Sequence, residues 1–281
     1  MNVRRMLRSL YRLLPWRLTK VKDFYLWIEN FWRTLHRNRT VVRPIGGVYF
    51  RLELNQLIDS ALHFDGVFEP DTSELLARLA FPGMVYFDVG ANVGCHALPM
   101  AKMAGPTGRV YAFEPMTWAY KKFLKNLRLN QFSNVVVEKL ALGETVGTFR
   151  GFFRNQWPIS SKQPSIPPTI EEIQVDTMDN FCRRRNVEKV DLIKIDVDGM
   201  DLKVLRGGQQ TLARFRPRVI VEIGEYTLQA AGDSIESFFY FAKSLNYRIE
   251  SEKGNLLETV EDIRTAIPDL ANSTINVLLR P

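Results

Sequence analysis

The stretch V-Y-F-D-V-G-A-N-V-G, residues 85–94, contains residue types that could bind a small polar ligand. It is typical of a buried parallel strand that ends at Asp88 and is followed by a glycine turn and a helix. Gly90 and Gly94 would let the backbone approach a ligand where a Cβ atom would collide. The next predicted strand ends with Glu114, so a second carboxylate would reach the edge of the sheet where a ribose is usually bound. This pair predicts a nucleoside-containing cofactor.

The turn also indicates which cofactor this is. A dinucleotide site typically has G-x-G-x-x-G, whose backbone amides surround a pyrophosphate at a helix N-terminus. This chain has D-V-G-A-N-V-G instead, with Asp88 beside the turn and Asn92 within it. A carboxylate there would repel a pyrophosphate, but it suits a ligand that carries an ammonium and a sulfonium. S-adenosylmethionine carries both groups and is therefore the predicted cofactor.

Carboxylates also end the fourth and fifth predicted strands. D-L-I-K-I-D ends at Asp196, Asp198 follows two residues later, and V-I-V-E-I contains Glu222. In an open α/β sheet these strand ends point to the crevice where ligands bind. Methyl transfer to a hydroxyl requires alignment of the oxygen, removal of its proton and exclusion of water. Asp196 could therefore act as the base or orient the acceptor.

Three further residues are candidates for the same chemistry. Asp198 and Glu222 could share the role of Asp196 or hold a divalent ion that acidifies the hydroxyl. Carboxylates without an imposed spacing are a weak metal signature, however, and no metal site is predicted. His96 is a candidate base because a neutral imidazole accepts protons near pH 7, although packing against the sheet is the more ordinary role for it.

The chain of 281 residues can form one large domain with an appendage. Residues 1–45 contain eleven Lys or Arg and two acidic residues, whereas the whole chain has a net charge of only +7. The remainder is therefore slightly acidic, which argues against a nucleic-acid partner. We predict a basic amphipathic helical extension over residues 1–45 and a methyltransferase domain over residues 46–281.

The extension has two apolar stripes at helical spacing, one on each side of Pro15. No apolar run is long enough to span a membrane, and arginines interrupt any signal-peptide core. The stripes could pack on the domain, contact an anionic membrane surface or bind a protein partner. Cys95 and Cys182 provide neither a disulfide framework nor metal-ligand spacing. A cytoplasmic protein is predicted, and peripheral contact at the inner membrane face stays open.

The remaining pattern alternates between strands and helices, which is typical of an α/β fold. The apolar run 93–105 predicts a helix, and Pro99 should kink it or break it into two pieces. A third strand is expected over 135–143, with a hairpin bracketed by Gly143 and Gly147. The helix over 201–215 should be interrupted. The last two strands should pair antiparallel at one edge, because no helix long enough for a crossover separates them.

In order and spacing, four segments resemble the class I S-adenosylmethionine-dependent methyltransferases, and within them the FkbM family. They are F-E-P-D-T-S-E-L-L, V-Y-F-D-V-G-A-N-V-G, V-Y-A-F-E-P-M-T-W-A-Y-K-K-F-L-K-N-L-R-L-N, and D-L-I-K-I-D-V-D-G-M-D-L-K-V-L-R-G with V-I-V-E-I, within residues 68–225. The resemblance implies a Rossmann-like fold with a mostly parallel seven-stranded sheet and an antiparallel edge hairpin.

The resemblance also implies roles for individual residues. Asp88, Gly90, Asn92 and Gly94 would line the methionine end of the cofactor, and Glu114 would accept hydrogen bonds from both ribose hydroxyls. Ala141 and Leu142 follow the third strand, where the adenine commonly stacks, although both could equally be plain core residues. The family's usual K-I-D-x-E-G-x-E appears here as K-I-D-V-D-G-M-D, with aspartates at 198 and 201. Contacts that the family makes through the longer glutamates would have to be remade.

The predicted activity is O-methylation of a small-molecule or glycan hydroxyl, on a sugar or a polyketide-like metabolite. The acceptor class is implied by the resemblance alone. Nitrogen acceptors are a rival, but D-V-D-G stands where amine-methylating enzymes of nucleic acids often have N-P-P-Y or D-P-P-Y. The sequence is also compatible with a nicotinamide-dependent oxidoreductase, or with a catalytically silent, membrane-associated binding protein that has a methyltransferase fold.

Overall fold

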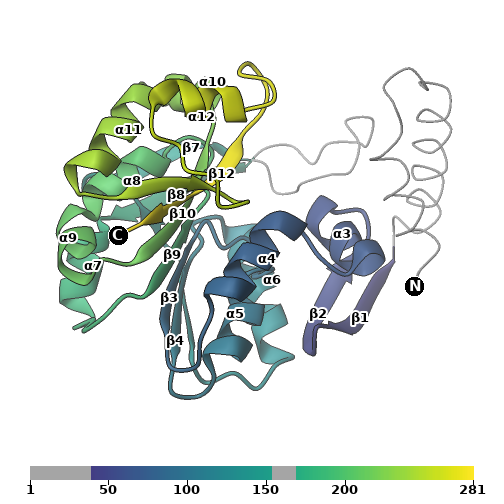
Figure 1. Ribbon diagram of the computed structural model, residues 1–281. Helices are drawn as coiled ribbons and strands as arrows, with labels where there is room; N and C mark the ends of the chain where they lie inside the picture. The colour runs from purple at the N-terminus through teal and green to yellow at the C-terminus, as the bar shows by residue number, and fades with distance from the viewer. Residues whose placement is uncertain (1–38, 154–168) are drawn as a thin grey trace, which may run out of the picture. The chain divides into compact units, whose positions relative to one another are not determined.

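A computed structural model describes residues 39–153 and 169–281 (Figure 1). The chain divides into two compact units, of which the smaller has residues 39–70 described and the larger comprises residues 71–153 and 169–281. Most of the predicted extension and the proline-rich stretch before Thr169 lie outside the described residues. The helical pattern of the extension and its contacts therefore stay predictions.

The smaller unit contains a β-hairpin and one helix. Strands β1 (Thr40–Ile45) and β2 (Val48–Glu53) pair antiparallel, and helix α3 (Leu57–Asp65) follows. The turn uses Gly46 and Gly47 at φ of 58° and 77°, which only glycine adopts readily. The boundary predicted after residue 45 falls inside this hairpin, between the end of β1 and the turn.

The larger unit is built on a seven-stranded sheet with the order β11-β12-β10-β9-β3-β4-β5. Its strands are β3 (Val85–Val89), β4 (Arg109–Phe113), β5 (Val135–Glu138), β9 (Leu192–Ile195), β10 (Arg218–Ile223), β11 (Arg248–Ser251) and β12 (Ile275–Arg280). Strand β12 is antiparallel to both of its neighbours, and all other pairs are parallel. The mostly parallel sheet with an antiparallel pair at one edge is confirmed. The short helix α12 (Val260–Ala266), which we did not expect, joins the two strands of that pair.

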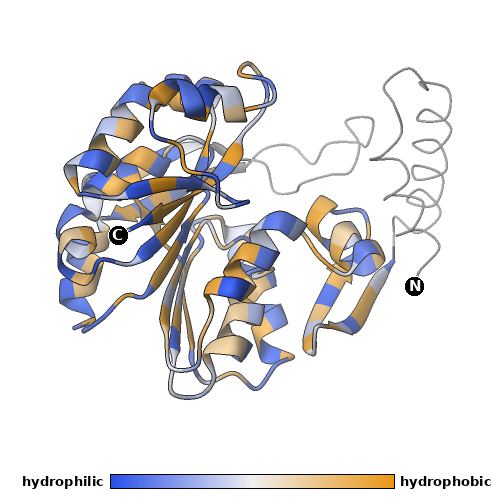
Figure 2. Cartoon of the chain, viewed as in Figure 1, coloured by the Kyte–Doolittle hydropathy of each residue, from blue (hydrophilic) through white to orange (hydrophobic). Residues whose placement is uncertain are grey.

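Helices flank both faces of this sheet (Figure 1). On one side lie α5 (Ala97–Ala104) and α6 (Thr117–Arg128), and on the other lie α8 (Asp201–Gly207), α9 (Gln209–Phe215) and α11 (Ile235–Ser244). The remaining helices are α4 (Pro70–Leu79), α7 (Met178–Arg184) and α10 (Glu225–Ala230). Hydrophobic residues recur along the central strands, while the helices alternate between hydrophobic and hydrophilic positions (Figure 2). In the described part of the chain, no helix combines the length and the apolar character that a membrane span needs.

The two faces of the sheet differ in polarity, because successive side chains on a strand point to opposite faces. One face is mainly apolar and joins helices α7 and α11 in the main core, which includes Phe87, Val89, Ile193, Ile195, Val219, Val221, Ile223, Val277, Phe181 and Phe238. The alternate positions include several polar side chains. Asp88 lies opposite Lys194, and Glu222 lies one position beyond the last paired residues of β9 and β10, next to Asp196. Cross-strand neighbours share a face, so the register gathers these polar groups on one face.

Two local predictions are wrong. Helix α5 begins at Ala97 rather than near Val93, so Pro99 lies in its first turn. A proline is tolerated there because the backbone N–H that it lacks has no partner within the helix, and α5 therefore continues through Pro99. The interruption predicted within residues 201–215 is confirmed, with Gly208 between α8 and α9.

The predicted third strand over 135–143 is also wrong, because it is divided between two sheets. Strand β5 ends at Glu138, and β6 (Ala141–Leu142) joins β8 (Thr169–Asp176) and β7 (Gly147–Phe153) in a separate sheet of order β6-β8-β7. Strand β7 pairs with β8 and not with β6, so the predicted hairpin does not form. Gly143 instead meets Gly207, where a Cβ atom would lie 1.9 Å from the Gly143 carbonyl oxygen.

Phe181 offers a test of the apolar face. Its ring is fully buried and contacts Phe87, Tyr111 and Phe113, with ring centroids 4.7 to 5.8 Å away. Phe181→Ala should lower the free energy of unfolding by about 3–5 kcal/mol, because a cavity would remain among these rings. Tyr240→Ala, at a side chain 67% exposed, should change it by less than about 0.5 kcal/mol. Chemical denaturation measures both, and equal losses would contradict the assignment of this core.

Candidate functional site

The turn after β3 and the turn after β9 are in direct backbone contact. The backbone N–H of Asp196 donates to the carbonyl of Val89 at 3.0 Å. Gly90 adopts φ of 84°, and a Cβ atom on it would lie 2.0 Å from the Asp196 carbonyl oxygen. Only glycine fits such an approach. The predicted cofactor turn and the predicted base are therefore held side by side.

Asp88 is buried at this point without a hydrogen-bond partner. Its side chain is 1% exposed, and neither carboxyl oxygen has a partner among the described residues. Burial raises the pKa of Asp88, while the charges of Lys194 and His96 and the neighbouring hydroxyl of Tyr86 lower it. The side-chain oxygen of Asn92, at φ of 48°, is likewise buried without a partner in the described part of the chain. Because buried polar groups are nearly always paired, these two side chains point to a polar ligand with a donor group.

Glu114 lies at the end of β4 and already organises the backbone around it. Its Oε2 accepts from the N–H of Asn92 and its Oε1 from the N–H of Met116, both at 2.8 Å. Burial raises the pKa of Glu114 to about 7, against the effect of these two hydrogen bonds. An ionised carboxylate has about four lone-pair sites, so acceptor capacity for two ribose hydroxyls is left.

Gly94 is required for a different reason from the one predicted. It adopts φ of 85°, and a Cβ atom there would lie 2.7 Å from the ring of Phe123 on α6. The side chain of Asn126 on the same helix donates to the Val93 carbonyl at 2.9 Å. Gly94 thus lets α6 pack against the turn, and its predicted contact with the cofactor stays a prediction.

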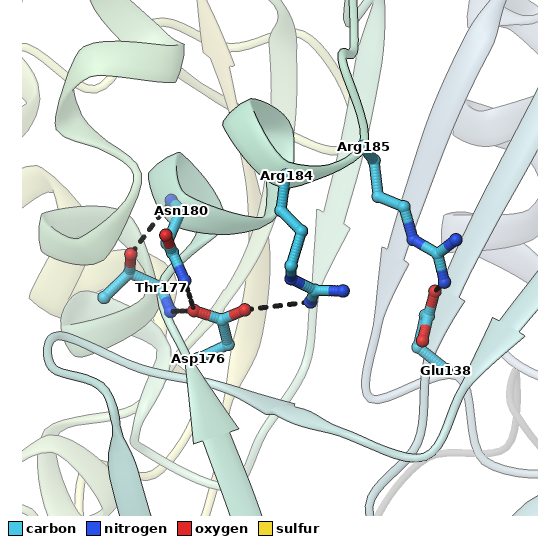
Figure 3. Close-up of polar contacts among 6 residues, drawn as sticks. All are labelled: Glu138, Asp176, Thr177, Asn180, Arg184 and Arg185. Carbon is cyan, nitrogen blue, oxygen red and sulfur yellow. Dashed lines mark hydrogen bonds and ion pairs between the residues drawn. The ribbon is translucent and has the colours of Figure 1, made fainter.

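Ala141 and Leu142 form β6, which is anchored through Asp176 at the end of β8. Asp176 accepts hydrogen bonds from the Thr177 backbone, the Asn180 side chain and the Arg184 guanidinium at 2.6 to 3.0 Å (Figure 3). Nearby, Arg185 pairs with Glu138 at the end of β5 (Figure 3). Leu142 is buried and Ala141 half-buried. Their predicted contact with the adenine stays a prediction.

A charge pair between a buried lysine and the partly exposed Asp196 lies on the other side of the Gly90 contact. The ammonium of Lys194 lies 2.7 Å from Oδ2 of Asp196, and the Lys194 side chain is 2% exposed. Burial alone would raise the pKa of Asp196, but the Lys194 charge and hydrogen bond outweigh it and lower this pKa. Burial and the Asp196 charge raise the pKa of Glu222 to about 8, although Thr274 donates a hydrogen bond to it at 2.7 Å. At neutral pH Asp196 is therefore ionised and Glu222 mainly protonated.

The remaining candidates divide into exposed and structural groups. Asp198 is exposed and has φ of 52°, two residues after Asp196. Asp201 is buried and accepts from the N–H groups of Val197 and Gly199 at 3.1 and 2.9 Å, so it holds the loop that leads into α8. His96 is buried immediately before α5, and its charge lowers the pKa of both Asp88 and Asp196.

Two polar residues of the site were missed at the level of the sequence. Lys194 carried a usable signal, because Lys194 and Asp196 are two residues apart on a strand and must share a face. Glu171 on β8 had no such signal in the sequence. It accepts hydrogen bonds from the backbone and the hydroxyl of Thr117, which is 54 residues away in the sequence. Within residues 39–153 and 169–281, no three His, Cys, Asp or Glu side chains gather as a metal ion would require.

Comparison with known proteins identifies a family. The model of the methyltransferase FkbM domain matches residues 88–249, which is more than half of the chain. Methyltransferase 1 of Beauveria bassiana is 27% identical over 48% of this chain and 63% of its own length. The 2-O-methyltransferase NoeI of Sinorhizobium fredii is 23% identical over 54% of this chain and 70% of its own. The hexuronic acid methyltransferase AglP of Haloferax volcanii is 29% identical over 55% of this chain and 62% of its own.

The crystal structure of methyltransferase FkbM from Methylobacillus flagellatus matches with a TM-score of 0.46 and 17% identity. That match covers 71% of this chain and 44% of the other. The chain thus spans less than two thirds of the length of the Beauveria protein and less than half of the Methylobacillus protein.

The contact at Gly90 gives a test of the site. Gly90→Ala should lower the free energy of unfolding by more than about 4 kcal/mol, because the two turns must separate as well as accept a positive φ. Gly66→Ala is the control, since Gly66 has a left-handed conformation with φ of 75° but nothing lies within 4 Å of its Cβ position. It should cost about 1–2 kcal/mol. Denaturation curves that show equal costs would contradict the close contact.

Proposed function

The chain belongs to the FkbM methyltransferase family, and we propose that it transfers a methyl group from S-adenosylmethionine to a hydroxyl of a small molecule or glycan. One observation carries this proposal. The buried Asp88 comes just before the Gly90 turn, and the backbone of that turn contacts the backbone of Asp196, whose carboxylate pairs with Lys194. One carboxylate can bind a cationic donor while the other accepts a proton.

The residues present fit this cofactor. The buried Asp88 needs a cation or a donor, and the ammonium of S-adenosylmethionine would provide one. Asn92 has an unused buried side-chain oxygen for a second polar contact. Glu114 has free acceptor capacity for the ribose hydroxyls. When bound, the cofactor supplies an electrophilic methyl group on a sulfonium.

The rest of the mechanism is assigned to this chain's own side chains. Asp196 is kept ionised by Lys194 and can accept the proton of an acceptor hydroxyl as the oxygen attacks. Glu222 is mainly protonated at neutral pH and can donate a hydrogen bond to Asp196 or to the acceptor. The exposed Asp198 next to them can orient further hydroxyl groups. His96, whose charge lowers the pKa of both Asp88 and Asp196, is the second candidate base.

An oxygen acceptor is supported by the relatives. NoeI is named a 2-O-methyltransferase and AglP a hexuronic acid methyltransferase. The family match does not favour the oxidoreductase or the silent binding protein. Calorimetry with S-adenosylmethionine and with NAD distinguishes the oxidoreductase, because the proposal requires saturable binding of S-adenosylmethionine alone.

Cofactor binding should depend on pH through Glu114. Its pKa of about 7 leaves the free carboxyl half protonated at neutral pH, and only the ionised form accepts two hydroxyl donors. The Kd for S-adenosylmethionine should therefore fall as the pH rises from 6 to 8. Glu114→Gln should bind more weakly at pH 8 and lose this dependence, while Glu172→Gln, at an exposed position of β8, should behave as the parent. Calorimetry at both pH values tests this. A Kd that does not change with pH would contradict a contact between Glu114 and the ribose.

Turnover should depend on Asp196. In assays with methyl-labelled S-adenosylmethionine and a panel of sugar and polyketide hydroxyls, the parent should label at least one acceptor. Asp196→Asn should lower kcat by about 10²–10⁴-fold, because the acceptor proton loses its base. Its Kd for the cofactor should stay within about threefold of the parent, and Asp269→Asn, at an exposed position, should keep full activity. Parent-like turnover by Asp196→Asn would exclude Asp196 as the base.

A further inference from the structure

Lys194 is the most deeply buried cation of the described residues that takes part in an ion pair. Its side chain is 2% exposed, and its Nζ donates to Oδ2 of Asp196 at 2.7 Å. A buried ammonium is costly unless it is paired, because it loses its hydration. An apolar side chain would be the ordinary occupant of this central strand, since the residues on either side of it, Ile193 and Ile195, are both fully buried hydrophobics. The position therefore calls for an explanation.

The register places Lys194 between the two halves of the site. On one side it lies opposite Asp88 of β3, and on the other side opposite Ile220 of β10. Its charge acts on both carboxylates, and its Nζ donates a hydrogen bond to Asp196. One buried cation thus favours the ionised form of Asp196, to which it is hydrogen-bonded, and also lowers the pKa of Asp88.

We propose that Lys194 is a positioning residue for the methyl transfer, which holds Asp196 in its charged form and fixes its Oδ2 so that the carboxylate is ready to receive the acceptor proton. This inference rests on the proposed function, because it assigns to Asp196 the role of base. Lys194 itself does not contact the acceptor or transfer a proton.

Several other titratable groups also affect the pKa of Asp196, so their effects must be distinguished from the effect of Lys194. The titratable side chains that face it from β3, the start of α5, the loop into α8 and β10 are Tyr86, Asp88, His96, Asp198, Asp201 and Glu222. A negative charge on any carboxyl group among them would favour a protonated Asp196, whereas the hydrogen bond with Glu222 lowers the pKa of Asp196. Lys194 is first among the groups that oppose them, with His96 after it.

The chain contains a matched pair for comparison. Lys189 and Asp191 have the same two-residue spacing, with Nζ and Oδ2 3.1 Å apart, but the Lys189 side chain is 52% exposed. Water screens such a pair, so its loss should have little effect on either group. Lys189→Met therefore makes the same chemical change as Lys194→Met without removing a buried charge.

The test is a carboxyl titration by NMR of the full chain labelled at aspartate Cγ, with Asp196→Asn used to assign the Asp196 signal. The titration midpoint of Asp196 in the parent should lie below that of an ordinary aspartate. Lys194→Met should raise it by at least about 1.5 pH units, since one close opposite charge shifts a carboxyl by about 1–3 units. Lys194→Arg should keep it within about one unit of the parent, and Lys189→Met should not move it.

Two results would overturn the proposal. One is an Asp196 midpoint in Lys194→Met that stays within about half a unit of the parent, which would leave Lys194 a purely structural residue. The other is a parent midpoint above that of an ordinary aspartate, which needs no variant and so decides the matter even if Lys194→Met does not fold.

The role in turnover has its own readout. With an acceptor from the panel, the acid limb of the kcat/KM profile of Lys194→Met should move to higher pH by the same amount as the NMR midpoint, while the Kd for S-adenosylmethionine stays within about threefold. An unmoved acid limb would overturn the inference. The NMR titration requires no acceptor and can therefore be interpreted separately from turnover. A parent protein that methylates no acceptor would refute the proposed function, whereas the titration would still show whether Lys194 controls the charge of Asp196.

Discussion

The contact between Gly90 and the carbonyl of Asp196 is the constraint on which the site depends. Neighbouring parallel strands normally diverge into separate loops once their ladder ends. Here the ladder is extended by the hydrogen bond from Asp196 to Val89, and the absence of a Cβ at Gly90 lets the two turns touch. Asp88 on β3 and Asp196 after β9 are 108 positions apart in the sequence but lie beside one backbone junction. In the proposed function, this junction would align the cofactor and the acceptor without a contribution from flexible loops.

The polar face of the sheet assigns different protonation states to chemically similar groups. Asp196 is paired with a buried cation and is ionised, whereas burial next to that negative charge keeps Glu222 protonated up to about pH 8. Two carboxyl groups whose environments push their pKa values apart can act as base and hydrogen-bond donor at one pH. Strands β9 and β10 place Asp196 and Glu222 as cross-strand neighbours. Their different protonation states therefore depend on the strand register and on the charge of Lys194.

The sequence predicted those features that depend on periodicity or on a short contiguous motif. The buried strand before Gly90, the strand ends at Asp196 and Glu222 and the break near Gly208 all follow from local pattern. Pro99 misled us because a proline excludes the interior of a helix but not its first turn, and the pattern alone does not fix where α5 begins. The third strand was predicted wrongly because the apolar residues of β6 follow closely after β5 in the sequence, but β6 pairs with β8, more than thirty residues away. Contacts such as that of Glu171 with Thr117 depend wholly on tertiary structure.

The shortened acidic box is explained by what its three aspartates contact. Asp201 bonds the backbone amides of Val197 and Gly199 within its own loop, and an aspartate reaches amides two and four residues before it without bending the chain further. A longer side chain at 201 would have to fold back on itself in a site that is 1% exposed. Asp198 faces outward at a positive φ, so its shorter side chain leaves more room beside Asp196. The departure from the family pattern therefore changes the loop residue Asp201 and the exposed residue Asp198. The Lys194–Asp196 pair is not part of this departure.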